Sequence, residues 1–178
     1  AREHLRRALA RVPAIADRLV HPRVHYVHGN HDRVAADVLG AAERVTLGPS
    51  SCRVMFVHGH QFDPVARRAL ALANLGTWTT GRLRAWGLPK IAGWFEARDV
   101  EIKDRKFRGA QGPYALAAAA LCRAHDVSAV VMGHTHAAGV VPTADGYSVN
   151  TGTCSEGRWE GVSIDTARAR VEVWIEDA

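Results

Sequence analysis

Apolar side chains between Leu5 and Leu19 recur at the spacing of an amphipathic helix, with arginines between them. Pro13 falls inside this run and removes one helical hydrogen bond, so we expect a helix over residues 2–19 that bends or splits there. Residues 23–27 are β-branched and aromatic and stop at Gly29, which predicts a short strand. Residues 32–39 predict a short helix that ends at Gly40.

The middle of the chain alternates between strand and helix patterns. Residues 43–47 and 52–57 predict two strands joined by a turn over residues 48–51. Residues 64–86 are mostly helical in pattern, and we expect breaks near Gly76 and Gly81. A further short helix is expected over residues 88–98.

The last third begins with an Ala-rich helix over residues 113–125 and a buried-type strand over residues 127–132. Four short strands with tight turns follow, and we expect them over residues 139–141, 147–151, 161–165 and 170–175. Alternating β and α elements followed by β-hairpins are typical of a layered α/β protein with a mixed sheet or two packed sheets. No linker divides the chain, so we expect a single domain over residues 1–178.

Composition narrows the class of protein. The chain has 178 residues, of which 47% are hydrophobic and 23% charged, which excludes wholesale disorder. Its longest apolar run, from Ala115 to Cys122, is far shorter than the ~20 residues that span a bilayer. Its three cysteines are scattered and show no metal-binding spacing. We therefore expect a reduced, cytoplasmic setting.

The positive charge is concentrated in residues 64–108. This segment holds ten basic and four acidic residues, a net charge of +6, whereas the whole chain carries +5. It also contains three of the five tryptophans, and we interpret it as a basic helical cap inserted into the domain. Such a composition suits an anionic substrate, single-stranded nucleic acid or the anionic surface of a membrane. The plainer interpretation is that the arginines cover the solvent side of the cap and the tryptophans anchor its packing.

Three clusters share one pattern, a hydrophobic strand followed by glycine and histidine. They occupy residues 27–32, 57–60 and 132–136. The carboxyl ends of neighbouring strands in an α/β sheet meet at one crevice, so we expect the three clusters to lie together. Imidazole and amide oxygen in one place predict a metal centre, with the amide favouring metals of higher coordination number. The other strand-end and loop histidines, His21, His25, His28 and His125, are expected to be solvated or hydrogen-bonded residues.

These clusters resemble the blocks of the calcineurin-like metallophosphoesterases. That family carries Asp-x-His, Gly-Asp, Gly-Asn-His-Asp/Glu, a histidine commonly followed by glycine, and Gly-His-x-His. The last three blocks match Gly29–Asp32, His58-Gly59 and Gly133–His136. The resemblance implies a layered α-β-β-α sandwich. Because the first two blocks are absent, we expect the chain to be an N-terminally truncated member of that fold.

The resemblance also implies roles for individual residues. Asn30, His58 and His134 correspond to ligands of the second of two metal ions, and His136 corresponds to a ligand of the first. The remaining ligands would lie upstream.

His31 corresponds to the catalytic histidine that donates a proton or hydrogen bond to the leaving oxygen. Asp32 is expected to fix its loop, and His60 is expected to contact substrate or support a ligand.

The implied activity is metal-dependent hydrolysis of a phosphoester or pyrophosphate bond. Two divalent ions, of manganese, iron, zinc, nickel, cobalt or magnesium, would activate water and clamp the phosphoryl oxygens. UDP-diacylglucosamine hydrolases of this superfamily carry a helical cap at the same place, so the expected substrate is a phosphorylated small molecule or a nucleotide-linked lipid. Those enzymes typically have arginine at the position of His31 and His-Gly-Asp at that of His58-Gly59-His60. Two alternatives stay open: a non-catalytic interaction module, and a nuclease-like phosphodiesterase.

Overall fold

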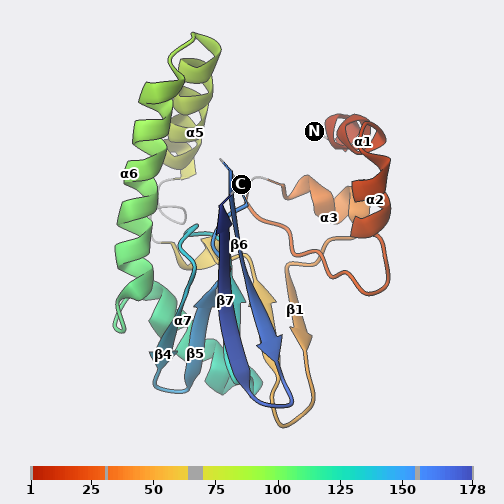
Figure 1. Cartoon of the computed structure of the whole chain (residues 1–178), viewed down its shortest axis with the longest axis vertical. Coiled ribbons are helices and arrows are strands. Elements are labelled where there is room, and N and C mark those ends of the chain that lie inside the picture. The colour runs from red at the N-terminus through yellow and green to blue at the C-terminus, as the bar shows by residue number, and fades with distance from the viewer. Residues whose placement is uncertain (1, 31, 64–69, 155–156, 178) are drawn as a thin grey trace.

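The computed structural model describes residues 2–30, 32–63, 70–154 and 157–177, and within them the chain has a mixed α/β fold (Figure 1). A five-stranded sheet has the order β1-β2-β3-β5-β4. Its strands are β1 (Arg44–Leu47), β2 (Val54–Val57), β3 (Ala129–Met132), β4 (Gly139–Thr143) and β5 (Gly146–Asn150). β2, β3 and β5 are parallel neighbours, whereas β1 and β4 run antiparallel at the two edges. The predicted mixed sheet is therefore confirmed.

One face of this sheet is covered by helix α7 (Pro113–His125). Proline begins the helix, where its missing N–H is not needed, and Asp126 ends it in the left-handed conformation (φ 50°). Ala115 and Ala118 pack against Met55 and Val130 of the sheet. Small alanines let the helix backbone approach the sheet closely, and this cluster forms the larger of two hydrophobic cores.

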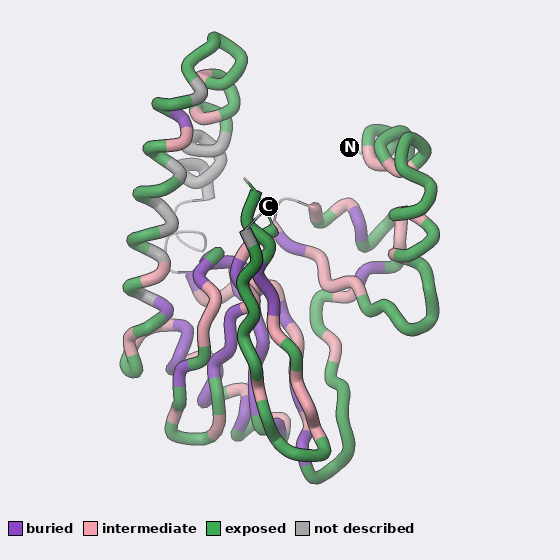
Figure 2. Tube along the Cα trace, in the orientation of Figure 1, coloured by how far each residue is buried: buried purple, intermediate pink, exposed green. Residues whose placement is uncertain are grey.

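The opposite face is covered by a separate hairpin of strands β6 (Arg158–Asp165) and β7 (Arg170–Asp177). Val162, Ile164 and Val171 of this hairpin pack on Val54 and Val131 of the sheet. These three side chains are partly buried, so each stabilises the fold by less than the about 1.5–3 kcal/mol that complete burial of such a side chain gives. The described chain thus has three layers, helix, sheet and hairpin, and Figure 2 shows the buried residues concentrated in the middle layer.

The N-terminal region forms α1 (Arg2–Ala10), α2 (Pro13–Leu19) and α3 (Val34–Leu39). Pro13 occupies the first turn of α2, so the predicted split at the proline is confirmed. Gly40 ends α3 with a φ of 66°, as the sequence predicts.

The strand predicted over residues 23–27 is wrong. Only an isolated parallel bridge between Val27 and Ala42 forms there. A strand needs a neighbour along its whole length to satisfy its N–H and C=O groups, and the bridge at Ala42 is the single ladder partner that the described residues give this segment. Residues 24–28 therefore form a loop that leads to Gly29.

The cap is a hairpin of two helices, α5 (Leu70–Ala85) and α6 (Pro89–Arg108), that projects away from the sheet (Figure 1). The expected breaks near Gly76 and Gly81 are wrong, because α5 is continuous through both. A glycine in a helix costs only about 1 kcal/mol, which packing against α6 can offset. The predicted start of this helix at residues 64–69 lies outside the described residues.

Helix α6 is much longer than the predicted 88–98. Glu101 forms ion pairs with Arg98 and Arg105, both at 2.6 Å, and Asp104 pairs with Arg108 at 2.7 Å. These pairs at spacings of three and four residues support the extra turns. No helix in the described part of the chain is both long and apolar enough to cross a membrane.

Candidate metal and phosphate site

Two parallel strands deliver histidine loops to the same edge of the sheet. β2 ends before His58 and Gly59, and its neighbour β3 ends before Gly133 and His134. The backbone N–H groups of Gly133 and His134 both donate to the carbonyl oxygen of His58, at 3.2 and 3.1 Å. The two loops are therefore fixed to each other through the main chain.

Gly59 makes this approach possible. Its φ is 100°, in the left-handed region that side chains avoid, and a Cβ there would lie 3.0 Å from Cβ of Met132. The chain then turns into a short 3₁₀ helix, η1 (His60–Phe62), which brings His60 back toward His58.

Three imidazole rings gather where the loops meet. The ring centroid of His58 lies 5.1 Å from that of His60 and 5.2 Å from that of His134, and His60 and His134 are 6.4 Å apart. The Nδ1 atoms of His58 and His60 are 3.1 Å apart. His134 is 7% exposed, so this cluster is sheltered from water on one side.

The cluster favours uncharged imidazole. Burial, together with the nearby rings of His134 and His60, lowers the pKa of His58 to about 3. Burial also lowers the pKa of His60, with Arg33 the next largest cause. Neutral imidazole is the form that binds a metal ion, so these rings need lose no proton before ligation.

The loop after Val27 lies against this cluster. A Cβ on Gly29 would lie 2.6 Å from Nε2 of His58, so the loop backbone contacts the ring directly. Asp32 closes the loop by accepting hydrogen bonds from the Gly29 N–H and the Tyr26 hydroxyl. Burial and this carboxylate raise the pKa of Tyr26 to about 12.

Asn30 lies in the same loop and has an unusual environment. Its Oδ1 is buried and has no hydrogen-bond partner among the described residues. A buried carbonyl oxygen without a donor costs about 1–3 kcal/mol, so such an atom calls for a ligand or a cation. The predicted catalytic residue of this loop, His31, lies outside the described residues.

His136 is placed less centrally than the other predicted ligands. It is exposed and has a left-handed φ of 58°. Its charge makes the smallest contribution to the lowered pKa of His58, so it belongs to the same electrostatic neighbourhood.

Asp63 is a site residue that the sequence reasoning missed. It is 4% exposed, and its Oδ2 lies 3.3 Å from Nε2 of His134. The sequence does place this carboxylate four residues after Gly59, in the loop that follows β2. Nothing in that loop indicates that Asp63 contacts His134, which lies 71 positions away.

Asn150, at the end of β5, is a second missed residue. Its amide nitrogen donates to Oγ1 of Thr135 at 2.8 Å, and its Oδ1 accepts from the Gly152 N–H at 2.9 Å. Asn150 and Thr135 are fully buried, so this network braces the loop that carries His134 and His136.

The donor set suits a divalent cation in kind. Within the described ranges, no three His, Cys, Asp or Glu side chains are arranged to hold a metal ion. The neutral imidazole of His58, the imidazole of His134 and the unsatisfied oxygen of Asn30 are nevertheless the donor types that such a cation binds. Because the buried Asn30 oxygen has no hydrogen-bond partner among the described residues, these residues fit a bound metal ion.

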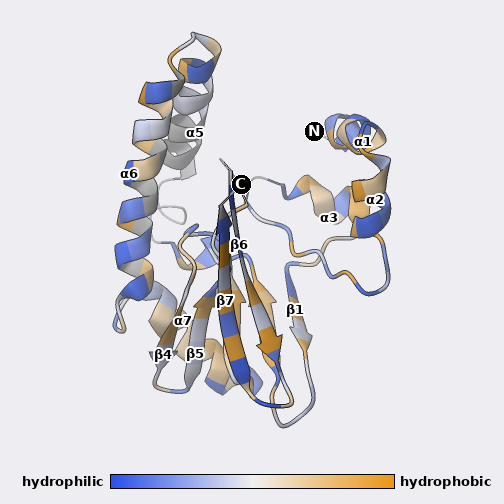
Figure 3. Ribbon diagram, in the orientation of Figure 1, coloured by the Kyte–Doolittle hydropathy of each residue, from blue (hydrophilic) through white to orange (hydrophobic). Residues whose placement is uncertain are grey.

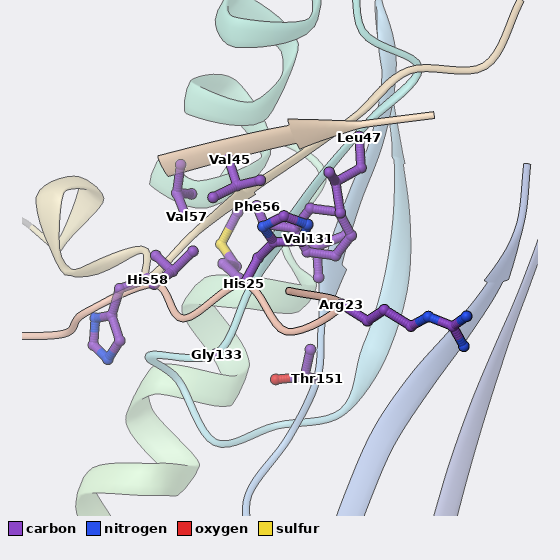
Figure 4. A pocket seen from close by; sticks show the side chains of 12 residues that line it. Arg23, His25, Val45, Leu47, Phe56, Val57, His58, Val131, Gly133 and Thr151 are labelled. Carbon is purple, nitrogen blue, oxygen red and sulfur yellow. The ribbon is translucent and has the colours of Figure 1, made fainter. Parts of the chain in front are cut away.

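A cavity of ≈ 390 Å³ opens beside the cluster (Figure 4). Figure 4 shows His58 at one end of it and Arg23 near the other, with apolar side chains such as Phe56 and Val131 between them. The sheet face at the strand ends therefore offers apolar surface next to the polar cluster.

No model of a known protein family matches this chain, and no curated protein matches it either. The described structure itself establishes a mixed α/β protein with a cluster of histidines at the carboxyl ends of β2 and β3.

Proposed function

We propose that this chain is part of a metal-dependent phosphoesterase of the calcineurin-like type, with the α-β-β-α sandwich that this family implies. The observation that carries the proposal is the meeting of His58 and His134 at two neighbouring strand ends, against the loop of Gly29 that also carries the orphaned oxygen of Asn30. Metal ions bound at this edge would activate water and neutralise charge on the phosphoryl oxygens. Asn30, His58, His134 and His136 are the residues that would hold them.

The chain's own residues have distinct tasks in this proposal. Asp63 orients the imidazole of His134 through the contact at 3.3 Å, and Asp32 holds the loop of Asn30. Such outer partners fix the ring and its tautomer before any ligand arrives. His31 donates a proton or hydrogen bond to the leaving oxygen.

Substrate binding uses the charge around His60. Arg33 is exposed, and after burial its positive charge is the next largest cause of the lowered pKa of His60. A cation at the mouth of the cluster attracts an anionic phosphate, and an exposed arginine can hold two of its oxygens at once. A phosphodiester or pyrophosphate is the proposed substrate class.

Metal binding tests the proposal directly. We expect titration calorimetry with Mn²⁺ to show binding that His134→Ala abolishes, whereas His125→Ala, which changes a half-buried histidine of α7, leaves it intact. Elemental analysis after desalting should then find metal in the parent chain and in His125→Ala, but not in His134→Ala. Equal metal content in all three proteins would refute the site.

Activity is a separate readout. In the protein that includes the upstream ligands implied by the resemblance, we expect Mn²⁺-dependent hydrolysis of bis(p-nitrophenyl) phosphate that falls at least about a hundredfold in His31→Ala, the magnitude typical of losing one acid–base or electrostatic group. Metal binding without hydrolysis would favour the alternative of a non-catalytic module built on the same fold.

A further inference from the structure

Helix α6 carries an exposed apolar stripe. Ile91, Trp94, Phe95 and Ile102 follow the spacing of one helical face, and all four are exposed. Ala92, on another side of the helix, is completely buried. The helix therefore has a packed face and, separately, an apolar face that no described residue covers.

The turn between α5 and α6 extends this stripe. Trp86 is 66% exposed and Leu88 41%, and Trp94 on the first turns of α6 is 63% exposed. The turn lies at the end of the cap that is farthest from the sheet (Figure 1). We call residues 78–95 the cap tip. Figure 3 shows hydrophobic and hydrophilic segments interleaved along both helices here.

The charge of the cap tip has one sign. Residues 78–95 contain Arg82, Arg84 and Lys90 and no acidic residue. The guanidinium of Arg82 lies 5.2 Å from the ring centre of Trp78, a cation–π distance. Farther down α6, Arg98, Arg105 and Arg108 are paired with Glu101 and Asp104. The acidic residues thus neutralise the base of the cap and leave the tip cationic.

We propose that the cap tip docks on the surface of an anionic lipid bilayer. Tryptophan places an apolar ring in the acyl boundary and its N–H at the level of the headgroups, and Lys and Arg reach from an apolar stem to lipid phosphates. No described helix can cross a membrane, so the cap would lie on the surface rather than span it.

The aliphatic side chains favour lipid over nucleic acid. Single-stranded nucleic acid is held by stacking on aromatic rings together with basic residues. Leu88 and Ile91 are exposed beside the tryptophans and have no ring on which a base could stack. Transfer of these side chains from water into an apolar phase lowers the free energy, and a bilayer supplies such a phase.

Sedimentation with vesicles tests this proposal, which is independent of the enzymatic one. Vesicles of phosphatidylcholine alone are compared with vesicles of phosphatidylcholine and phosphatidylglycerol in equal parts. We expect the protein to bind the anionic vesicles, with a blue shift of tryptophan fluorescence, and to be released by high salt. The double variant Trp86→Ala/Trp94→Ala should bind at least about tenfold more weakly.

A matched control keeps the result specific. Trp159 on β6 is 54% exposed and lies outside the cap, so Trp159→Ala should leave binding unchanged. Lys90→Ala should weaken binding to anionic vesicles about fivefold, the effect of one interfacial cation. Far-ultraviolet circular dichroism of each variant confirms that its helices persist.

Three results would overturn the proposal. The first is no binding to anionic vesicles, and the second is equal loss in the Trp159→Ala control. The third is that the protein binds a single-stranded oligonucleotide but not vesicles, and that Trp86→Ala/Trp94→Ala loses the oligonucleotide. That result would assign the cap tip to nucleic acid instead.

Discussion

The carboxylate of Asp63 lies 3.3 Å from Nε2 of His134, and both side chains are buried. This contact joins the loop after β2 to the loop after β3, close to where Gly133 and His134 donate to the carbonyl of His58. The side-chain contact and the main-chain hydrogen bonds together hold the ends of β2 and β3 in a fixed arrangement. The contact with Asp63 therefore helps to fix the position of the His134 ring.

Replacing Asp63 should therefore disturb the proposed metal site without changing any proposed ligand. We expect Asp63→Asn to weaken Mn²⁺ binding by about 10–100-fold, the range found when a partner of a ligating histidine is lost. Asp63→Ala should also lower the free energy of unfolding by about 1–3 kcal/mol, because it leaves a buried ring nitrogen without this acceptor. Calorimetry and urea unfolding measure the two effects.

Asp145→Asn is the matched control for that pair. Asp145 pairs with Arg123 at the surface, at 2.7 Å, and such exposed pairs contribute about 0–1 kcal/mol. Mn²⁺ affinity should not change in this variant. If Asp145→Asn weakens binding as much as Asp63→Asn does, the effect is one of net charge and the positioning role of Asp63 is wrong.

Gly29 offers a steric test of the same cluster. A methyl group there would lie 2.6 Å from Nε2 of His58, so Gly29→Ala must push the ring aside. We expect Mn²⁺ binding to weaken at least about tenfold, as for other displaced ligands. Gly81→Ala meets nothing within 4 Å inside α5 and should leave binding unchanged while slightly stabilising the helix. Unchanged binding in Gly29→Ala would show that the ring can move without consequence.

The Tyr26–Asp32 hydrogen bond predicts a dependence on alkaline pH. The folded-state pKa of Tyr26 is raised from 10.0 to about 12 by burial and by Asp32. A group whose pKa is raised on folding stabilises the protein below its unfolded pKa, and this contribution is lost as pH rises from about 10 through about 12. Tyr26→Phe removes the donor, so its unfolding free energy should be lower at neutral pH and converge toward that of the parent chain above this window. Absorbance titration should show one tyrosinate transition fewer at the highest pH, and parallel stability curves would contradict the prediction.

The sharp turn after β5 should be intolerant of any side chain. Gly152 has a φ of 78°, and a Cβ there would lie 2.1 Å from Oε2 of Glu160, a buried carboxylate that accepts from the Thr153 N–H at 2.9 Å. We expect Gly152→Ala to lower the free energy of unfolding by more than about 2 kcal/mol, the sum of backbone strain and a displaced buried charge.

Gly157→Ala separates the two causes. Gly157 has nearly the same φ, 80°, but nothing lies within 4 Å of its missing Cβ. Gly157→Ala should therefore lower the free energy of unfolding only by the cost of the left-handed backbone, about 1–2 kcal/mol. Equal losses at both positions in urea unfolding would mean that Glu160 moves freely.

Local patterns predict much of this fold and only part of the site. Pro13 divides the first helix, and glycines after β2 and β3 mark the turns that carry His58 and His134, all as the sequence indicates. The continuous helix through Gly81 and the length of α6 could not be predicted in the same way. They depend on packing between the two helices and on ion pairs, which outweigh the small local cost of glycine.

Long-range contacts set the limit at the site. The partnership of Asp63 with His134 joins residues 71 positions apart, and no periodicity in either loop encodes it. The segment before Gly29 shows the converse, because its β-branched residues predict a strand that forms only the Val27–Ala42 bridge. Propensity describes what a segment can do, and neighbours in space decide whether it does so.

The parallel pairing of β2 with β3 has a consequence for the order of folding. It matches Val54 with Ala129, and the whole cap and α7 lie between them in the chain. Closing so long a loop has a large entropic cost that is recovered only once the strands have paired, whereas helices and the β6–β7 hairpin form from nearby residues. We therefore expect a refolding chain to regain its helices first and its histidine cluster last, so that the candidate site at this edge forms only with the final closure of the sheet.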